Sequence, residues 1–172
     1  MAQILFGIDK VRFMDIGRIN GTTGVLDTIA GSVDLGKTVG GVTINQAEET
    51  IEIMSDQSAD PEVIVPIRLG KDFTIRLRDC NPQNLALAFG GTVVGTNIVV
   101  FPATMPSATE KAVEITTKGG AGLVKKKVII ARAKLNLNGT LEFNVSDGSM
   151  LEITGQVLAP SSGTKSWSII AG

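Results

Sequence analysis

Alternation of apolar and polar residues is the feature of this sequence that most restricts its fold. Residues 50–53 alternate isoleucine with threonine and glutamate, and residues 73–78 alternate Phe, Ile and Leu with Thr and Arg. A period of two places successive side chains on opposite faces of an extended chain, so each segment is typical of a half-buried strand. Similar alternation at 113–115, 129–137 and 141–157 extends the pattern. We predict about eight to ten strands in a mostly β protein, arranged as a sandwich or barrel.

The longest alternating run, residues 129–137, is followed by Asn138 and Gly139. This dipeptide is typical of a tight hairpin turn, because both residues tolerate positive φ. We therefore expect a hairpin that joins residues 129–137 to a return strand at 141–145. The apolar faces expected for these two strands are Ile129, Ala131, Ala133, Leu135 and Leu137, and then Leu141, Phe143 and Val145.

One stretch, NPQNLALAFGG at residues 81–91, does not follow the period of two. Asn81 can cap a helix, Pro82 suits the first turn, and Gly90 can end the helix in the left-handed conformation. We predict one short helix at about 81–90, flanking the sandwich. The face expected to pack on the strands consists of Leu85, Ala88 and Phe89.

The chain of 172 residues fits one domain, 1–172, with a core of its own. Glycine interrupts short apolar pieces throughout residues 1–32, which we interpret as an N-terminal arm with one or two short strands. We expect this arm to have no core of its own. Residues 33–172 are then the β-sandwich core.

Histidine is absent, and Cys80 is the single cysteine. The usual general base and the commonest neutral metal ligand are therefore missing, and one thiol cannot form an internal disulfide. We expect no enzyme, with no catalytic residue, no cofactor and no metal site. The net charge of -1 gives no positive field for nucleic acid or an anionic membrane. No apolar run reaches the length of about 18 residues that a membrane-spanning helix requires, so no membrane partner is expected.

Residues 31–38, GSVDLGKT, match the phosphate-loop pattern G-x-x-x-x-G-K-T. Such a loop needs a helix that begins near its Lys and Thr, so that backbone amides can hold the phosphates. Residues 39–44, VGGVTI, contain two glycines and four β-branched residues, which disfavour that helix. We expect strand structure after Thr38, with Gly36 and Gly40 serving turns or bulges.

A longer stretch, residues 49–91, resembles the middle of the tail tube proteins of long-tailed bacteriophages. It reads ETIEIMSDQSADPEVIVPIRLGKDFTIRLRDCNPQNLALAFGG. The resemblance rests on an acidic strand, a polar loop with Asp56 and Pro61, a glycine before an alternating strand, and the short helix. It extends more loosely over residues 123–158. The chain departs from the family where the helix begins, since CNPQN stands where a more acidic first turn is expected.

This resemblance implies a β-sandwich whose inner sheet joins those of its neighbours in a ring of six subunits. Stacked rings would form the tail tube, the conduit that delivers the genome into the host. The implied partners are further copies of the chain, other tail proteins such as the tape measure and terminator, and double-stranded DNA that passes without specific binding. The expected location is the virion tail, after assembly in the host cytoplasm. Aromatic residues total 4%, so a lumen formed by this chain would offer few aromatic side chains on which DNA bases could stack.

Ring stacking is expected to use a polar loop at residues 55–62, with Lys125, Lys126 and Lys127 as the opposite charge. These lysines open a strand whose two faces should separate them. Two alternatives remain open: a small β-barrel module that binds a ligand or a carbohydrate, for which only Trp167 could serve as an aromatic platform, and the tube protein of a contractile injection system. The loop consists of Ser55, Asp56, Gln57, Ser58, Ala59, Asp60, Pro61 and Glu62.

Overall fold

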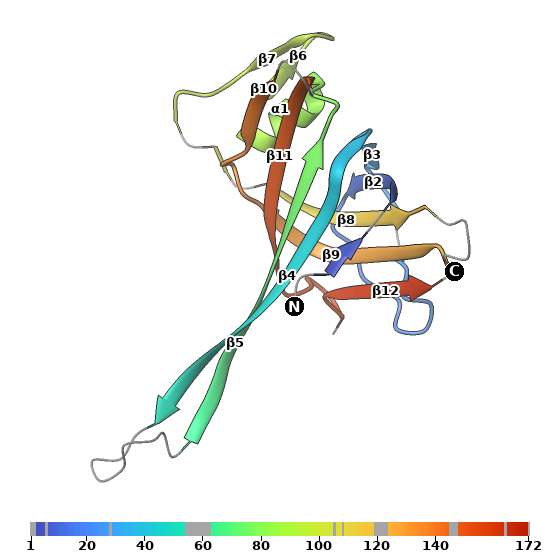
Figure 1. The fold of residues 1–172 in the computed structure, drawn as a ribbon, viewed down its shortest axis with the longest axis vertical. Helices are drawn as coiled ribbons and strands as arrows, with labels where there is room; N and C mark the ends of the chain where they lie inside the picture. The colour runs from blue at the N-terminus through green and yellow to red at the C-terminus, as the bar shows by residue number, and fades with distance from the viewer. Residues whose placement is uncertain are drawn as a thin grey trace.

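In its described residues, the computed structural model is a mostly antiparallel β fold with one short helix, as the sequence predicts (Figure 1). It describes residues 3–5, 7–27, 29–53, 63–104, 106–107, 109–118, 124–144, 148–163 and 165–171. The elements are β1 (Gln3–Leu5), β2 (Ile8–Met14), β3 (Val33–Asp34), β4 (Thr38–Ile53), β5 (Val63–Leu77), α1 (Pro82–Phe89), β6 (Thr92–Val94), β7 (Ile98–Val100), β8 (Glu110–Thr117), β9 (Lys126–Leu135), β10 (Thr140–Asn144), β11 (Gly148–Val157) and β12 (Trp167–Ala171).

The strands follow one hydrogen-bonded path, β1-β4-β5-β11-β9-β8-β2-β3, that turns back on itself to make two layers. The corner lies where β11, paired with β5 along most of its length, pairs with β9 through residues 155–157. In Figure 1, β4, β5 and β11 run steeply across β8 and β9. β10 adds to β11, β12 adds to β9, and β6 and β7 form a separate hairpin.

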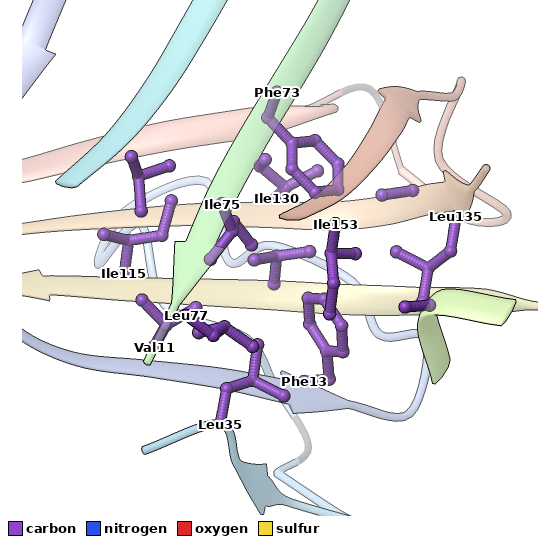
Figure 2. Packing of buried hydrophobic residues seen from close by; sticks show 14 of the residues in the cluster. Val11, Phe13, Leu35, Phe73, Ile75, Leu77, Ile115, Ile130, Leu135 and Ile153 are labelled. Carbon is purple, nitrogen blue, oxygen red and sulfur yellow. The ribbon is translucent and has the colours of Figure 1, made fainter. Parts of the chain in front are cut away.

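The core lies between these two layers. Phe73 and Ile75 of β5 and Ile153 of β11 face Ile115 of β8 and Ile130 of β9, and all five side chains are fully buried (Figure 2). Strands from both halves of the chain supply this cluster, so neither layer has a core without the other. The arrangement is a β-sandwich with crossed layers.

The prediction that residues 129–137 show a single apolar face is wrong. The register of β8 and β9 shifts by one residue between the pairs Lys111–Ala133 and Val113–Ile130, which is a β-bulge in β9. The extra residue reverses the alternation. Val128 and Ile130 therefore face the main core before the bulge, whereas Ala133 and Leu135 face it after the bulge.

The predicted hairpin at Asn138 and Gly139 is also wrong, because β10 pairs with β11 and not with β9. Residues 136–139 instead carry the chain from one layer to the other. Gly139 has no positive φ. A Cβ atom at Gly139 would lie 2.8 Å from the Cβ atom of Ala88, so the glycine permits close packing on the helix and does not serve a turn.

The N-terminal segment has more packing than the sequence suggests, and the expectation that it lacks a core is wrong. β2 lies inside the sheet and contributes Val11 and Phe13 to the main core. Residues 15–27 cover the opposite face of the β8–β9 sheet, where Ile19 and Leu26 pack in a second cluster. The other members of this cluster are Met14, Ala112, Ile129 and Ala131, with Val25 and Ile170 packed against it.

Helix α1 forms where the sequence predicts it, with both of its caps. The side chain of Asn81 accepts a hydrogen bond of 2.8 Å from the backbone N–H of Asn84, and Gly90 ends the helix at φ 70°. Of the predicted packing face, Ala88 is fully buried, whereas Leu85 and Phe89 are half-buried at the edge of the core. Among the described residues, no helix is long and apolar enough to cross a membrane.

Candidate assembly surfaces

The ends of β4 and β5 form a two-stranded ribbon that projects from the sandwich, as Figure 1 shows. We define the ribbon as residues 45–53 and 63–71, which pair with each other from Gln46–Lys71 to Ile53–Val63, with one register shift between Glu49 and Thr50. β1 pairs with β4 only at residues 42–44, and β11 pairs with β5 only from residue 72 onward. Within the described residues, no strand pairs with either outer edge of the ribbon.

The ribbon exposes apolar side chains that nothing in the described part of the chain covers. Ile51 is 50% exposed and Ile64 is 57% exposed. Ile51 is in register with Val65, and Ile64 is in register with Glu52. Facing residues share one face of a sheet and neighbours in sequence alternate, so the two isoleucines lie on opposite faces of the ribbon.

A second apolar surface surrounds the helix. Leu85 and Phe89 of α1, Phe101 after β7 and Leu141 of β10 line a groove of about 470 Å³. The rings of Phe89 and Phe101 meet edge to face, with centroids 6.0 Å apart. Two residues beyond Leu141 on the same strand, Phe143 is 81% exposed.

Sequence reasoning did not identify this groove, although one signal for it was present. Residues 80–109 contain no Asp, Glu, Lys or Arg, in a chain of which 19% is charged. Five large apolar side chains of this segment and its neighbour β10 are exposed: Val94, Ile98, Val100, Phe101 and Phe143. Several exposed large apolar side chains in and beside one uncharged segment indicate a candidate interaction site.

Of the predicted stacking residues, the loop 55–62 lies outside the described residues, so its role stays a prediction. β9 begins at Lys126, so Lys125 precedes the strand and Lys126 and Lys127 are adjacent residues within it. Lys127 lies 3.3 Å from Glu114, and Lys125 lies 3.7 Å from Asp9. Two of the three lysines therefore already have an acidic partner in their own chain, which reduces the charge available to a second subunit.

Further ion pairs continue across the same strands. Glu114 is 4% exposed between Lys127 and Arg12, whose guanidinium lies 3.6 Å away. At the next strand, Lys10 contacts Asp34 at 2.7 Å. Burial raises the pKa of Asp34, but the hydrogen bonds from Lys10 and the Gly36 amide, with the positive charges nearby, outweigh it and hold the pKa below its usual value.

The phosphate-loop match has no phosphate-binding geometry. β4 begins at Thr38, so a strand stands where the helix would be required, as predicted. The amide of Gly36 donates to the carboxylate of Asp34, and the amide of Lys37 donates to Asp79 at 2.8 Å. These two amides are therefore already hydrogen-bonded to carboxylates and are not free to bind a phosphate. Gly36, at φ 81°, serves the turn.

The remaining candidate residues are structural. Trp167 is half-buried against the main core, and the ammonium group of Lys71 lies 5.4 Å from the centre of its ring. A ring in this position offers no free platform for a sugar. Cys80 is half-buried against the same core. Within the described ranges, no three His, Cys, Asp or Glu side chains come together as a metal site.

No protein-family model and no curated protein matches this chain. In the part of the chain that the structure describes, the ribbon and the groove are two surfaces to which no contact inside the subunit gives a role. In Figure 1, α1 and β10, which help to line the groove, lie at one end of the long axis of the molecule, and the ribbon lies at the other end.

Proposed function

We propose that this chain is a tail tube protein of a long-tailed bacteriophage. In this role it assembles into stacked rings, six subunits to a ring, and the tube of rings conducts the genome into the host. The observation that carries the proposal is the ribbon, residues 45–53 and 63–71, whose two outer edges have no partner strand in the described part of the chain.

Physical chemistry favours a partner for the ribbon. A two-stranded hairpin is at best marginally stable in water, and its unpaired N–H and C=O groups are a template for another strand. Pro66 stands in this part of β5, and proline is tolerated at an edge because it has no N–H to donate. Pro66 therefore removes one hydrogen-bond donor from this edge, but the other backbone groups can still pair with a partner strand.

A ring also needs lateral contacts, for which the sandwich has edges available. β1, β3, β10 and β12 each pair on one side only among the described strands. Pairing of such edges between neighbouring subunits would satisfy their backbone groups and close a barrel, as the family resemblance implies. Which edges meet is left to the experiment.

The charge of the protein is compatible with a conduit. A net charge of -1 gives no general attraction for double-stranded DNA, and the single tryptophan is held against the core by its neighbours. The DNA would pass without specific binding. The tape measure and terminator proteins would be the further partners in the virion tail.

Electron microscopy of the purified protein tests the proposal directly. Wild-type protein is expected to form rings or tubes at high concentration. Deletion of residues 56–60, between β4 and β5, should abolish long tubes and leave folded subunits or single rings. Salt should weaken wild-type stacking in the same direction, because charged contacts at a ring surface are screened. Tubes of normal length from the deletion variant would remove this loop from stacking.

The groove supports a second candidate, a small β module that binds an apolar ligand. Its volume falls within the range of about 300–1,000 Å³ that is usual for small-molecule sites. The four lining residues in the described part of the chain are all apolar, whereas such sites normally also present a few polar groups that orient the ligand. A protein that sediments as a monomer at every concentration and binds an apolar probe saturably would favour this candidate over the tube.

A further inference from the structure

A hollow of about 480 Å³ lies where the beginnings of β2 and β4 approach the ends of β3, β5 and β8. We call it the basic hollow, because four basic and two acidic residues line it in the described part of the chain. It therefore carries an excess of two positive charges, on a chain whose net charge is -1. The six charged residues are Lys10, Lys37, Arg78, Lys118, Asp9 and Asp34.

Both carboxylates of the basic hollow already have a basic partner. The ammonium group of Lys10 lies 2.7 Å from the carboxylate of Asp34, and that of Lys125 lies 3.7 Å from the carboxylate of Asp9. The other three basic lining residues form no ion pair within the described ranges: Lys37, Arg78 and Lys118.

Backbone hydrogen bonds hold the three segments that carry these unpaired cations. The N–H of Arg78 donates to the carbonyl of Lys37 at 2.8 Å, and the N–H of Lys118 donates to the carbonyl of Gly7. The N–H of Lys37 donates to the carboxylate of Asp79. The segments are therefore in place before a ligand arrives, which lowers the ordering cost of binding. Because like charges repel, three cations around one hollow favour an anion as the ligand.

The number of cations distinguishes between the two anionic groups that are common in biology. A phosphate group presents at least three acceptor oxygens and up to two negative charges, whereas a carboxylate presents two oxygens and one charge. Basic side chains from three segments can each bind one oxygen of a phosphate group. Its two charges also match the excess of two positive charges in the basic hollow.

We infer that Lys37, Arg78 and Lys118 form a binding site for a phosphate group. This site differs from a phosphate loop, because side chains hold the anion and the amides of Gly36 and Lys37 do not. The phosphate group can be a free anion or part of a nucleic-acid backbone, since both present the same oxygens. The inference goes beyond the proposed assembly and does not depend on it.

Titration calorimetry of the purified chain with inorganic phosphate, at low and constant ionic strength, tests the site. Wild type is expected to bind phosphate saturably, and the double variant Lys37→Gln with Arg78→Gln at least about tenfold more weakly, because two charge-assisted contacts are lost. Lys165→Gln is the matched control, since Lys165 is exposed and does not line the basic hollow. It should bind phosphate as wild type does. Equal phosphate affinities of wild type and the double variant would overturn the inference.

Thermal unfolding separates loss of the site from loss of the fold. Without phosphate, the double variant should melt no lower than wild type, because it loses only exposed cations that repel one another. Added phosphate should raise the melting temperature of wild type and not that of the double variant, since a ligand stabilises the state that binds it. A rise of equal size in both proteins would place the anion elsewhere and overturn the assignment.

Two further probes identify the chemistry and the source of the ligand. At the same ionic strength, acetate and hexaglutamate should bind more weakly than phosphate. Binding of either as tightly as phosphate would overturn the assignment to a phosphate group. A short DNA duplex that displaces phosphate from wild type supports the site and identifies nucleic-acid backbone as a ligand. Phosphate binding that the duplex does not disturb supports the site with the free anion as its ligand.

Discussion

Two regions of the molecule share the alternating sequence pattern but differ in burial. One is the sheet formed by β2, β8 and β9, and the other is the ribbon formed by the ends of β4 and β5. Both faces of the sheet are covered: Ile115 on one face and Ile129 on the other are at most 1% exposed. Both faces of the ribbon are open, since Ile51 and Ile64 are at least 50% exposed. Apolar residues at alternate positions thus end in a core in one region and in solvent in the other.

This difference shows where the stability of the subunit originates. Burial of apolar surface contributes about 25 cal/mol per Å² to the free energy of folding, and the sheet buries apolar side chains on both of its faces. The two described isoleucines of the ribbon bury much less apolar surface inside one subunit. These side chains can contribute the same free energy only when another molecule covers them, so the ribbon is suited to assembly and the sheet to folding.

The largest expected effect is the loss of stability when a core side chain is removed, because the ribbon has no such core. Phe73→Ala removes a fully buried ring and should lower the free energy of unfolding by about 3–5 kcal/mol. Ile64→Ala, in the ribbon portion of the same strand, should change it by no more than about 0.5 kcal/mol. Chemical denaturation of the unassembled protein measures both. A loss of similar size for the two variants would mean that the ribbon is packed within the subunit.

An intermediate effect concerns the junction between the two layers and the helix. In Gly139→Ala the new Cβ atom would lie 2.8 Å from the Cβ atom of Ala88, and overpacking of this kind costs about 1–3 kcal/mol. Gly21→Ala is the matched control, because no atom lies within 4 Å of a Cβ atom placed at Gly21. Thermal unfolding of both variants makes the comparison. Equal melting temperatures would show that Gly139 does not limit helix packing.

The smallest expected effect is the pH-dependent contribution to stability of Asp34, on the charged surface beside the covered sheet. The lowered pKa of Asp34 means that its carboxylate stabilises the fold above its unfolded pKa of about 4, and that this contribution is lost as pH falls through the folded pKa. Because the pair with Lys10 is solvent-exposed, its size is at most about 1 kcal/mol. The difference in stability between wild type and Asp34→Asn should therefore vanish in acid. A difference that is constant from pH 7 to pH 2 would contradict this assignment.

The sequence by itself determined the features that depend on neighbouring residues. Asn81 and Gly90 predicted both ends of the helix, since capping is a matter of a few adjacent backbone groups. The β-branched residues after Thr38 correctly predicted a strand in place of a phosphate-binding helix. The alternating segments predicted a mostly β fold, because a period of two is a property of a single strand.

Tertiary structure alone decided what depends on contacts between distant segments. The bulge in β9 arises from its register with β8, and it reverses a pattern that looks continuous in sequence. Asn138 and Gly139 have the composition of a turn, but the helix carrying Ala88 needs a glycine opposite it. The groove gathers residues from α1, the segment after β7 and β10. Local sequence fixes the conformation of each segment, whereas pairing and burial between segments fix which faces remain exposed for a partner.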